Sequence, residues 1–161
     1  MVCLLPSHRS FVRIESAMRL NLFRGWPGSS KSTSAQRMFP GVLLVENDMF
    51  HMHNGKYEWS KESMPKAISW CVDMVRTALE NGMDVCVANT FTKRKFVEAY
   101  KKIAEEFGAE FHVYRCVGHF QNQHGLTPGM VAGFEKAMED WPGEIIVDPT
   151  EKLKRKLDVE W

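Results

Sequence analysis

The sequence has no long apolar run. No stretch approaches the roughly 18 residues that a membrane-spanning helix needs, and near the start the apolar residues 3–5 are soon followed by His8 and Arg9. That run is too short, and its charges come too early, for a secretory signal. We therefore expect a protein without a membrane partner that works in the cytoplasm.

Cysteine is also scarce, and the four cysteines show no CxxC spacing. Metal sites and redox motifs usually pair cysteines within such short repeats. Cys71 lies in a helical pattern, whereas Cys86 and Cys116 lie in apolar runs typical of strands. We interpret these residues as buried, reduced thiols and not as metal ligands.

An excess of charge of one sign is missing as well. The 21 basic and 20 acidic residues leave a net charge of +1, so any contact with a polyanion must come from a local patch. The length of 161 residues, 44% of them apolar, favours one globular domain. No repeat is visible, and nothing in the sequence predicts an oligomeric state.

What is present is a regular alternation of strand and helix patterns. The first 17 residues lie outside it and are predicted to be a loose extension, so that residues 18–161 form the domain. The charged tail, 151–161, is predicted to be a short helix or frayed end. The expected strands are 20–23, 42–45, 85–88, 111–117 and 145–147, and the expected helices are 31–38, 64–80, 93–107 and 130–138.

Two of these helices carry long apolar stripes, and 47–61 is expected to be a polar loop. One stripe includes Ile68, Cys71, Val75 and Leu79, and the other includes Phe96. Strands separated by helices predict an α/β fold with an open parallel sheet. Ligands bind such sheets beyond the carboxyl ends of the strands, so functional residues should lie in the loops that follow them.

The strongest motif follows the first strand. Residues 25–33, GWPGSSKST, fit G-x-x-x-x-G-K-[ST] at every fixed position except Ser30. Gly25 and Gly28 allow a tight turn whose N–H groups cradle phosphates at a helix N-terminus. Lys31 is predicted to reach the β- and γ-phosphates and Ser32 to bind Mg²⁺. The loop residues predicted to bind ATP are Gly25, Pro27, Gly28, Ser29, Ser30, Lys31, Ser32 and Thr33.

The alternative is a Gly/Ser turn that happens to precede a lysine, but a strand before the loop and a helix after it are the context that the motif requires. Ser30 stands where the pattern has glycine, so its side chain is expected to crowd the β-phosphate or strain the backbone. Weak nucleotide affinity, or a degenerate site without hydrolysis, is the consequence to test.

The second strand ends beside this loop in Glu46-Asn47-Asp48. A kinase acting on a hydroxyl needs a base within hydrogen-bond reach of it, and Asp48 is our candidate. The alternative is that Asp48 caps a turn or only positions water and Mg²⁺. Glu46 is interpreted as structural.

The loop after Asp48 offers two histidines and two aromatic residues. His51 and His53 are predicted to lie at the surface or at the acceptor site, because no third metal ligand is apparent. Tyr57 and Trp59 either stack on a base or pack the loop.

The third strand ends in Asn89-Thr90, which are expected to hold the acceptor or to order Asp48. Residues 93–95 (Lys-Arg-Lys) open the next helix. We interpret them as a solvated basic turn. The alternative is that they bind the phosphates of the acceptor.

With these motifs in place, the sequence resembles the P-loop kinases of the polynucleotide-kinase-like group, which includes small ATP-binding proteins of bacteriophages. The resemblance spans residues 18–147. It rests on the order and spacing of RGWPGSSKST, VENDMFHMHNGKYEW, the segment from ISWC to VANTFT, and NQHGLTPGMV.

The resemblance implies a three-layer αβα sandwich with a mainly parallel five-stranded sheet. It also implies ATP·Mg²⁺ as donor and phosphate transfer to a hydroxyl, often the 5′-OH of a nucleic acid. Lys31 and Ser32 would hold phosphate and Mg²⁺, and Asp48 would be the base. Gln121 and His124 would belong to a segment that closes over ATP. The sequence departs from the pattern of this family in two ways: Ser30 replaces a glycine, and residues 121–137 contain no arginine. Arg115 is the nearest arginine that could substitute.

We therefore predict an ATP-dependent kinase that acts on a polynucleotide 5′-hydroxyl or a nucleotide-like acceptor, with a DNA or RNA end as a possible partner. His51, Asn89 and Thr90 are the candidate acceptor-binding residues. One alternative is a small-molecule or modified-base kinase with the same donor site. The other is a nucleotide-binding module that has lost catalysis.

Overall fold

The computed structural model describes residues 18–122 and 124–149. The predicted extension of 1–17 and the predicted tail of 151–161 lie outside the described residues. Five parallel strands form the central sheet: β1 (Arg19–Arg24), β2 (Leu43–Val45), β5 (Val85–Ala88), β6 (Glu110–Cys116) and β7 (Ile145–Val147). Their order across the sheet is β2-β5-β1-β6-β7. The α/β fold with a parallel five-stranded sheet is thus confirmed.

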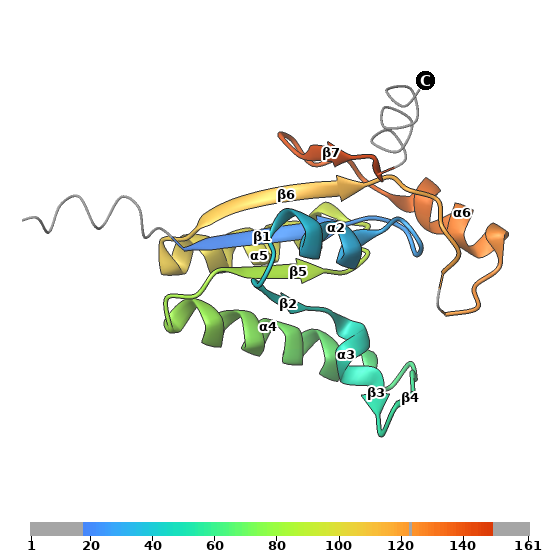
Figure 1. Cartoon of the computed structure of the whole chain (residues 1–161), viewed down its shortest axis with the longest axis horizontal. Helices are drawn as coiled ribbons and strands as arrows, with labels where there is room; N and C mark the ends of the chain where they lie inside the picture. Colours follow the sequence, from blue (N-terminus) through green and yellow to red (C-terminus); the bar gives the residue numbers. More distant parts are fainter. Residues whose placement is uncertain (1–17, 123, 150–161) are drawn as a thin grey trace, which may run out of the picture.

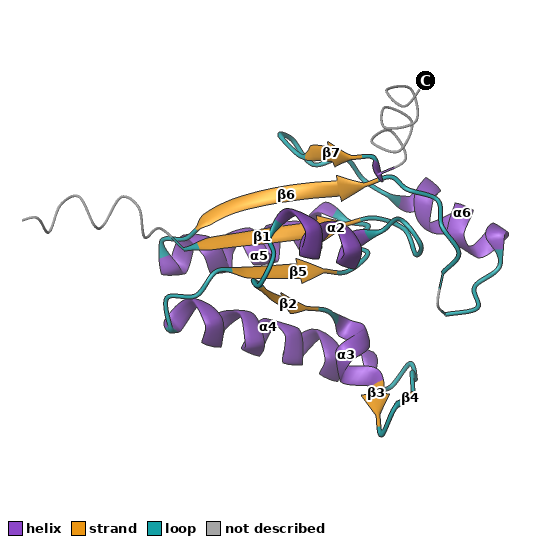
Figure 2. Cartoon of the chain, in the orientation of Figure 1, coloured by secondary structure: helices purple, strands orange, loops and turns teal. Residues whose placement is uncertain are grey.

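Helices cover both faces of the sheet (Figure 1). The short helix α2 (Lys31–Met38) covers one face, and α4 (Met64–Glu80) and α5 (Arg94–Phe107) cover the other. The α6 helix (Pro128–Ala137) lies beyond the carboxyl ends of the strands. The strands alternate with helices along the chain (Figure 2), as their apolar patterns predict.

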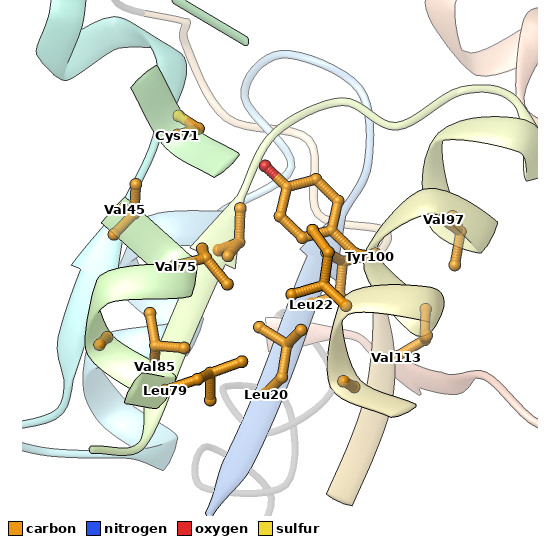
Figure 3. Packing of buried hydrophobic residues seen from close by; sticks show 14 of the residues in the cluster. Leu20, Leu22, Val45, Cys71, Val75, Leu79, Val85, Val97, Tyr100 and Val113 are labelled. Carbon is orange, nitrogen blue, oxygen red and sulfur yellow. The ribbon is translucent and has the colours of Figure 1, made fainter. Parts of the chain in front are cut away.

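The alternation of side chains along β1 divides the core into two parts. Leu20 and Leu22 face α4 and α5, where they pack with Val85, Val75 and Leu79 in the larger cluster (Figure 3). Phe23 belongs to the smaller cluster on the α2 side, in line with the period of two residues in a strand. The smaller cluster also contains Ala35, Cys86, Ala88, Tyr114 and Cys116.

Two predicted core positions are wrong. Ile68 of α4 is 47% exposed and Phe96 of α5 is 41% exposed. In α4 the buried stripe runs instead through Ala67, Cys71, Val75, Ala78 and Leu79. Cys71, Val75 and Leu79 are buried as predicted, but a pattern judged by its large residues selects Ile68 where the small Ala67 is the buried residue.

The predicted loop of 47–61 contains regular structure. It begins with α3 (Asn47–His51) and continues as a hairpin of β3 (Met52–His53) and β4 (Lys56–Tyr57). Asn54 and Gly55 at its tip have φ of 50° and 79°, which suits the two-residue turn that Asn-Gly favours. The Asn54-Gly55 dipeptide was a signal for this turn in the sequence, but strands of two residues are too short to show a periodic pattern.

The remaining boundaries agree within a few residues. Thr127 begins α6 by accepting a hydrogen bond from the Met130 backbone N–H at 3.2 Å. Among the described residues, every helix is too short or too polar to cross a bilayer. Cys71, Cys86 and Cys116 are buried and free, as predicted. Burial raises the pKa of Cys71 to about 12, so this thiol stays protonated at neutral pH.

Candidate active site

The loop between β1 and α2 requires glycine at two positions. Gly25 has φ of 156°, and a Cβ there would lie 2.6 Å from the Cys116 carbonyl oxygen and clash with the Ser29 hydroxyl. Gly28 has φ of 82°, and a Cβ there would clash with the Phe120 carbonyl oxygen. Pro27 and Ser29 are buried within the loop, whereas Thr33 points outward from α2. The two glycines let the chain fold back against β6 and the segment after it.

Ser30 adopts the left-handed conformation, with φ of 74° and ψ of 32°. It immediately precedes α2, and its hydroxyl lies 3.1 Å from that of Ser34. This conformation costs a residue with a Cβ about 1–2 kcal/mol relative to the right-handed region. The expected strain at Ser30 is therefore present.

Lys31 and Ser32 occupy the first turn of α2. The Lys31 ammonium donates to the Trp26 carbonyl oxygen at 3.0 Å, so the side chain curls over the loop. Burial lowers the pKa of Lys31, while negative groups that include Asp48 and Glu46 oppose this shift. A buried ammonium in a loop of backbone N–H groups suits a polyanion such as a triphosphate.

Glu46 is a functional candidate that the sequence interpretation missed. Its carboxylate accepts a short hydrogen bond from the hydroxyl of Ser32, the predicted Mg²⁺ ligand. Burial raises the pKa of Glu46, and the Ser32 hydrogen bond partly offsets this. Its position directly after β2 was the available signal.

A Mg²⁺ ion fits this pair of oxygen donors. Such ions use one or two protein oxygens together with substrate phosphates and water. Ser32 and Glu46 supply that number, and no group of three metal-ligating side chains occurs within the described ranges.

Asp48 lies on α3 with one contact on each carboxylate oxygen. The Tyr57 hydroxyl donates to Oδ1 at 3.1 Å, and His124 Nε2 lies 3.1 Å from Oδ2. The Tyr57 and His124 rings are 4.9 Å apart. Burial raises the pKa of Tyr57 to about 12, with a contribution from Asp48, so this hydroxyl remains a donor. Trp59 is exposed.

His51 is not at the surface. Its side chain is 1% exposed, with Nδ1 3.3 Å from the Ser63 hydroxyl and Nε2 without a hydrogen-bond partner among the described residues. It packs against the rings of Phe50 and Tyr57. The packing of the hairpin over α3 buries it, so it supports Tyr57 and does not face an acceptor. His53 is exposed.

Asn89 and Thr90 organise the backbone around the site. The Asn89 side-chain oxygen accepts from the Asn47 N–H at 2.9 Å, which holds the start of α3. The Thr90 carbonyl oxygen accepts from the Gly25 N–H at 3.2 Å. Asn89 therefore orders the helix that carries Asp48.

The segment from 118 to 122 is attached to the phosphate loop. The Phe120 N–H donates to the Gly28 carbonyl oxygen at 2.9 Å, and Trp26 Nε1 donates to that of Gly118 at 2.9 Å. Gln121 is exposed. A hollow of about 520 Å³ lies between this segment, α6 and the loop; its lining is Trp26, Pro27, His119, Phe120, Gln121, Asn122, Leu126, Pro128, Val131, Ala132 and Glu135.

The arginines near the strand ends do not face the phosphate loop. Arg24 and Arg115 are register partners on β1 and β6, and both contact Glu144, at 2.7 and 3.1 Å. Arg24, which the sequence interpretation overlooked, is completely buried and also donates to the carbonyl oxygens of Phe91 and Glu139. Arg115 therefore does not replace the missing arginines.

Arg94, in the basic turn of 93–95, donates to the Asp140 carbonyl oxygen at 2.6 Å. The Arg94 side chain therefore makes a structural contact with the segment before β7.

Comparisons with known proteins identify the family and the fold. A family model described as "AAA domain" matches residues 20–119. An uncharacterized protein of Pasteurella multocida (strain Pm70) is 31% identical over 156 residues, covering 86% of this chain and 87% of that protein.

Several solved structures share the fold. A proposed kinase of Chloroflexus aurantiacus has a TM-score of 0.62 at 18% identity, covering 90% of this chain and 96% of that one. The APS kinase CysC of Mycobacterium tuberculosis, in complex with AMPPNP and APS, has a TM-score of 0.57 at 15% identity, covering 89% and 97%. A chain of the Pnkp1/Rnl/Hen1 RNA repair complex has a TM-score of 0.54 at 18% identity, covering 79% and 41%.

Proposed function

This chain belongs to the AAA domain family, and from that premise we propose that it is a P-loop phosphotransferase that moves the γ-phosphate of ATP to a hydroxyl group. One observation carries the proposal. Lys31 and Ser32 open the helix after a glycine-shaped loop, and the carboxylates of Glu46 and Asp48 come from the end of β2 to the same place. Cation, metal donor and base are the parts that phosphoryl transfer needs.

Each residue has a role in this proposal. The phosphate loop holds the triphosphate through its N–H groups and Lys31, while Ser32 and Glu46 hold Mg²⁺. When bound, Mg²⁺ neutralises charge on the β- and γ-phosphates. Asp48 accepts the proton of the acceptor hydroxyl as its oxygen bonds to the γ-phosphorus. The bond from that phosphorus to the β–γ bridging oxygen breaks, and the electron pair leaves with ADP.

The acceptor is the finer part of the proposal. A polynucleotide 5′-hydroxyl or a nucleotide-like acceptor is consistent with the shared fold of the RNA repair chain. A small-molecule acceptor is equally consistent with the shared fold of the APS kinase. A panel of acceptors must decide between them.

One measurement tests the donor site. Calorimetry with AMPPNP and Mg²⁺ should show binding to the wild type and at least a tenfold loss with Lys31→Ala, because the buried ammonium is the main cation of the loop. Lys136→Ala, on α6, is the control for removal of a lysine. Equal binding by wild type and Lys31→Ala would refute the donor site.

The chemical step is tested with γ-labelled ATP, Mg²⁺ and a panel of 5′-hydroxyl DNA, RNA, nucleosides and sugars. Asp48→Asn should keep ATP affinity within a few-fold and lower transfer by about 10²-fold or more, the scale of a lost general base. Retained transfer would exclude Asp48 as the base. Loss of Mg²⁺-dependent binding would place it in the metal site instead.

A degenerate binding module is the second candidate, favoured by the strained Ser30 and by arginines committed to Glu144. A missing arginine can cost several orders of magnitude in rate. Binding of AMPPNP without any hydrolysis or transfer of ATP would select this candidate.

A further inference from the structure

A catalytic base must be held in place, and the local structure of Asp48 does not do this alone. The residue lies on α3, a helix of five residues, and its side chain is 44% exposed. A base works only within about 2.6–3.2 Å of the proton that it accepts. Misplacement by about 1 Å can cost 10²-fold in rate. Other residues must therefore restrict the Asp48 carboxylate.

Tyr57 and His124 occupy separate oxygens of that carboxylate. Tyr57 donates to Oδ1 and His124 Nε2 pairs with Oδ2, both at 3.1 Å. Two contacts on different oxygens fix the plane of the group as well as its position. A carboxylate has about four lone-pair sites, so each oxygen can still accept a second proton donor.

His124 comes from the opposite side of the phosphate loop. It lies between β6 and α6, whereas Asp48 and Tyr57 follow β2 at the far edge of the sheet. Figure 1 shows the β3–β4 hairpin and the segment before α6 beyond the same ends of the strands. The contact thus spans the sheet across the site of the phosphates.

The segment that carries His124 is itself ordered from the phosphate loop. Phe120 donates its N–H to Gly28. The Asn122 side-chain oxygen accepts from the N–H groups of His124 and Leu126 at 3.2 and 2.9 Å. Hydrogen bonds at Phe120 and Asn122, which the chain itself joins, and the ion pair of His124 therefore connect the Gly28 backbone to the Asp48 carboxylate.

Resting on the proposed role of Asp48 as base, we propose that His124 is a positioning residue. Together with Tyr57 it fixes the Asp48 carboxylate and ties its orientation to the phosphate loop. Occupancy of the loop by a triphosphate then acts on Asp48 through His124. His124 itself touches neither phosphate nor acceptor.

Hydrolysis of ATP without an acceptor provides a test, because water then takes the place of the hydroxyl. His124→Ala should lower kcat by about tenfold or more and leave KM for ATP within threefold. His124→Gln places an amide nitrogen near the lost Nε2 and should recover much of the rate. The double variant with Asp48→Asn should be no slower than Asp48→Asn alone, because both changes remove one effect.

His112→Gln is the matched control. His112 also pairs with a carboxylate, that of Glu110 at 3.3 Å, but at the amino end of β6. It should leave kcat unchanged. An increase in kcat with His124→Ala, an effect equal to that of His112→Gln, or additive losses with Asp48→Asn would overturn the proposal.

A spectroscopic measurement decides the case even if hydrolysis is too slow to follow. The ring signals of His124 in ¹H–¹³C spectra should move with Asp48→Asn and on addition of AMPPNP and Mg²⁺ to the wild type. Signals that stay in place in both experiments would overturn the proposal. A different result would show that the proposed function itself is wrong: wild type and Lys31→Ala would then bind AMPPNP equally.

Discussion

Ser30 holds a strained backbone conformation within the phosphate loop. Its φ of 74° is accessible to glycine without strain. The chain keeps the loop geometry with serine because the helix after it, the Gly28–Phe120 hydrogen bond and the buried Trp26 determine the backbone around it.

Ser30→Gly should therefore stabilise the protein and tighten AMPPNP binding. Relief of about 1–2 kcal/mol of strain is opposed by the roughly 0.5–1 kcal/mol that glycine's extra freedom costs, so a net gain of up to about 1.5 kcal/mol is expected. Urea denaturation and calorimetry measure both effects. Ser29→Gly, at a position without positive φ, should show no gain. Weaker binding by Ser30→Gly would mean that the serine hydroxyl serves the ligand.

Glu46 links stability to pH because burial raises its pKa above the ordinary value of 4.5. Between 4.5 and the higher native pKa, the folded protein binds the proton more tightly than the unfolded chain does. Stability supplied by this proton is present below pH 4.5 and is lost as pH rises through the native pKa. Above the native pKa the ionised Glu46 carboxylate can bind Mg²⁺, but its ionisation lowers the stability of the metal-free protein.

Glu46→Gln should consequently raise the Tm of the metal-free protein at pH 7 and make no difference near pH 4. The amide stays neutral and still accepts from Ser32. Melting curves over this pH range, with Glu62→Gln as an exposed control, provide the measurement. The same variant should weaken the Mg²⁺ dependence of AMPPNP binding. A Tm difference independent of pH would refute the linkage.

At the scale of elements, the carboxyl ends of β1 and β6 are joined to the segment before β7 by buried charges. Arg24 and Arg115 lie side by side, and Glu144 compensates both. Arg24 also holds the loop after β5 through the Phe91 carbonyl oxygen. This cluster braces the face of the sheet opposite α2, behind the phosphate loop.

Arg24→Met should lower the free energy of unfolding by about 3–5 kcal/mol, the cost of leaving a buried partner and carbonyl groups unpaired. Arg76→Met is the matched control, because its pair with Glu106 is exposed and should contribute far less to the free energy of unfolding. Urea denaturation followed by circular dichroism gives both values. Similar losses in the two variants would show that the Arg24 cluster is not a buried brace.

At the scale of the whole molecule, the described residues contain the two hydrophobic clusters and the five-stranded sheet. The first strand is already anchored at its start. The Arg19 N–H donates to Asp84 Oδ1, and the Met18 carbonyl oxygen accepts from the Glu110 N–H, both at 2.8 Å. The hypothesis that 1–17 is a loose extension remains to be tested.

A chain that begins at Met18 should melt within about 2 °C of the full chain. A chain that begins at Asn21 should melt far lower, because it loses buried Leu20 and the anchor of β1. Calorimetric scans of the three chains make the comparison. A fall of more than about 4 °C on removing only 1–17, on the order of 1 kcal/mol, would show that the extension packs on the domain.

The sequence by itself determined the features that depend on neighbouring residues. Short apolar runs predicted the five strands, and apolar stripes predicted the main helices. The length and period of such a pattern are local properties of the sequence. The phosphate loop was visible because glycines, lysine and serine must occur at a set spacing.

Only the tertiary structure decided which side chains meet. Ser32 and Glu46 come together across the inserted strand β5, and His124 reaches Asp48 from the other side of β1. Arg24 is buried because distant segments cover it. Such contacts follow from the order of strands in the sheet and from the path of loops between them. No period or spacing in the sequence records these two features, because they arise from packing among segments far apart in the chain.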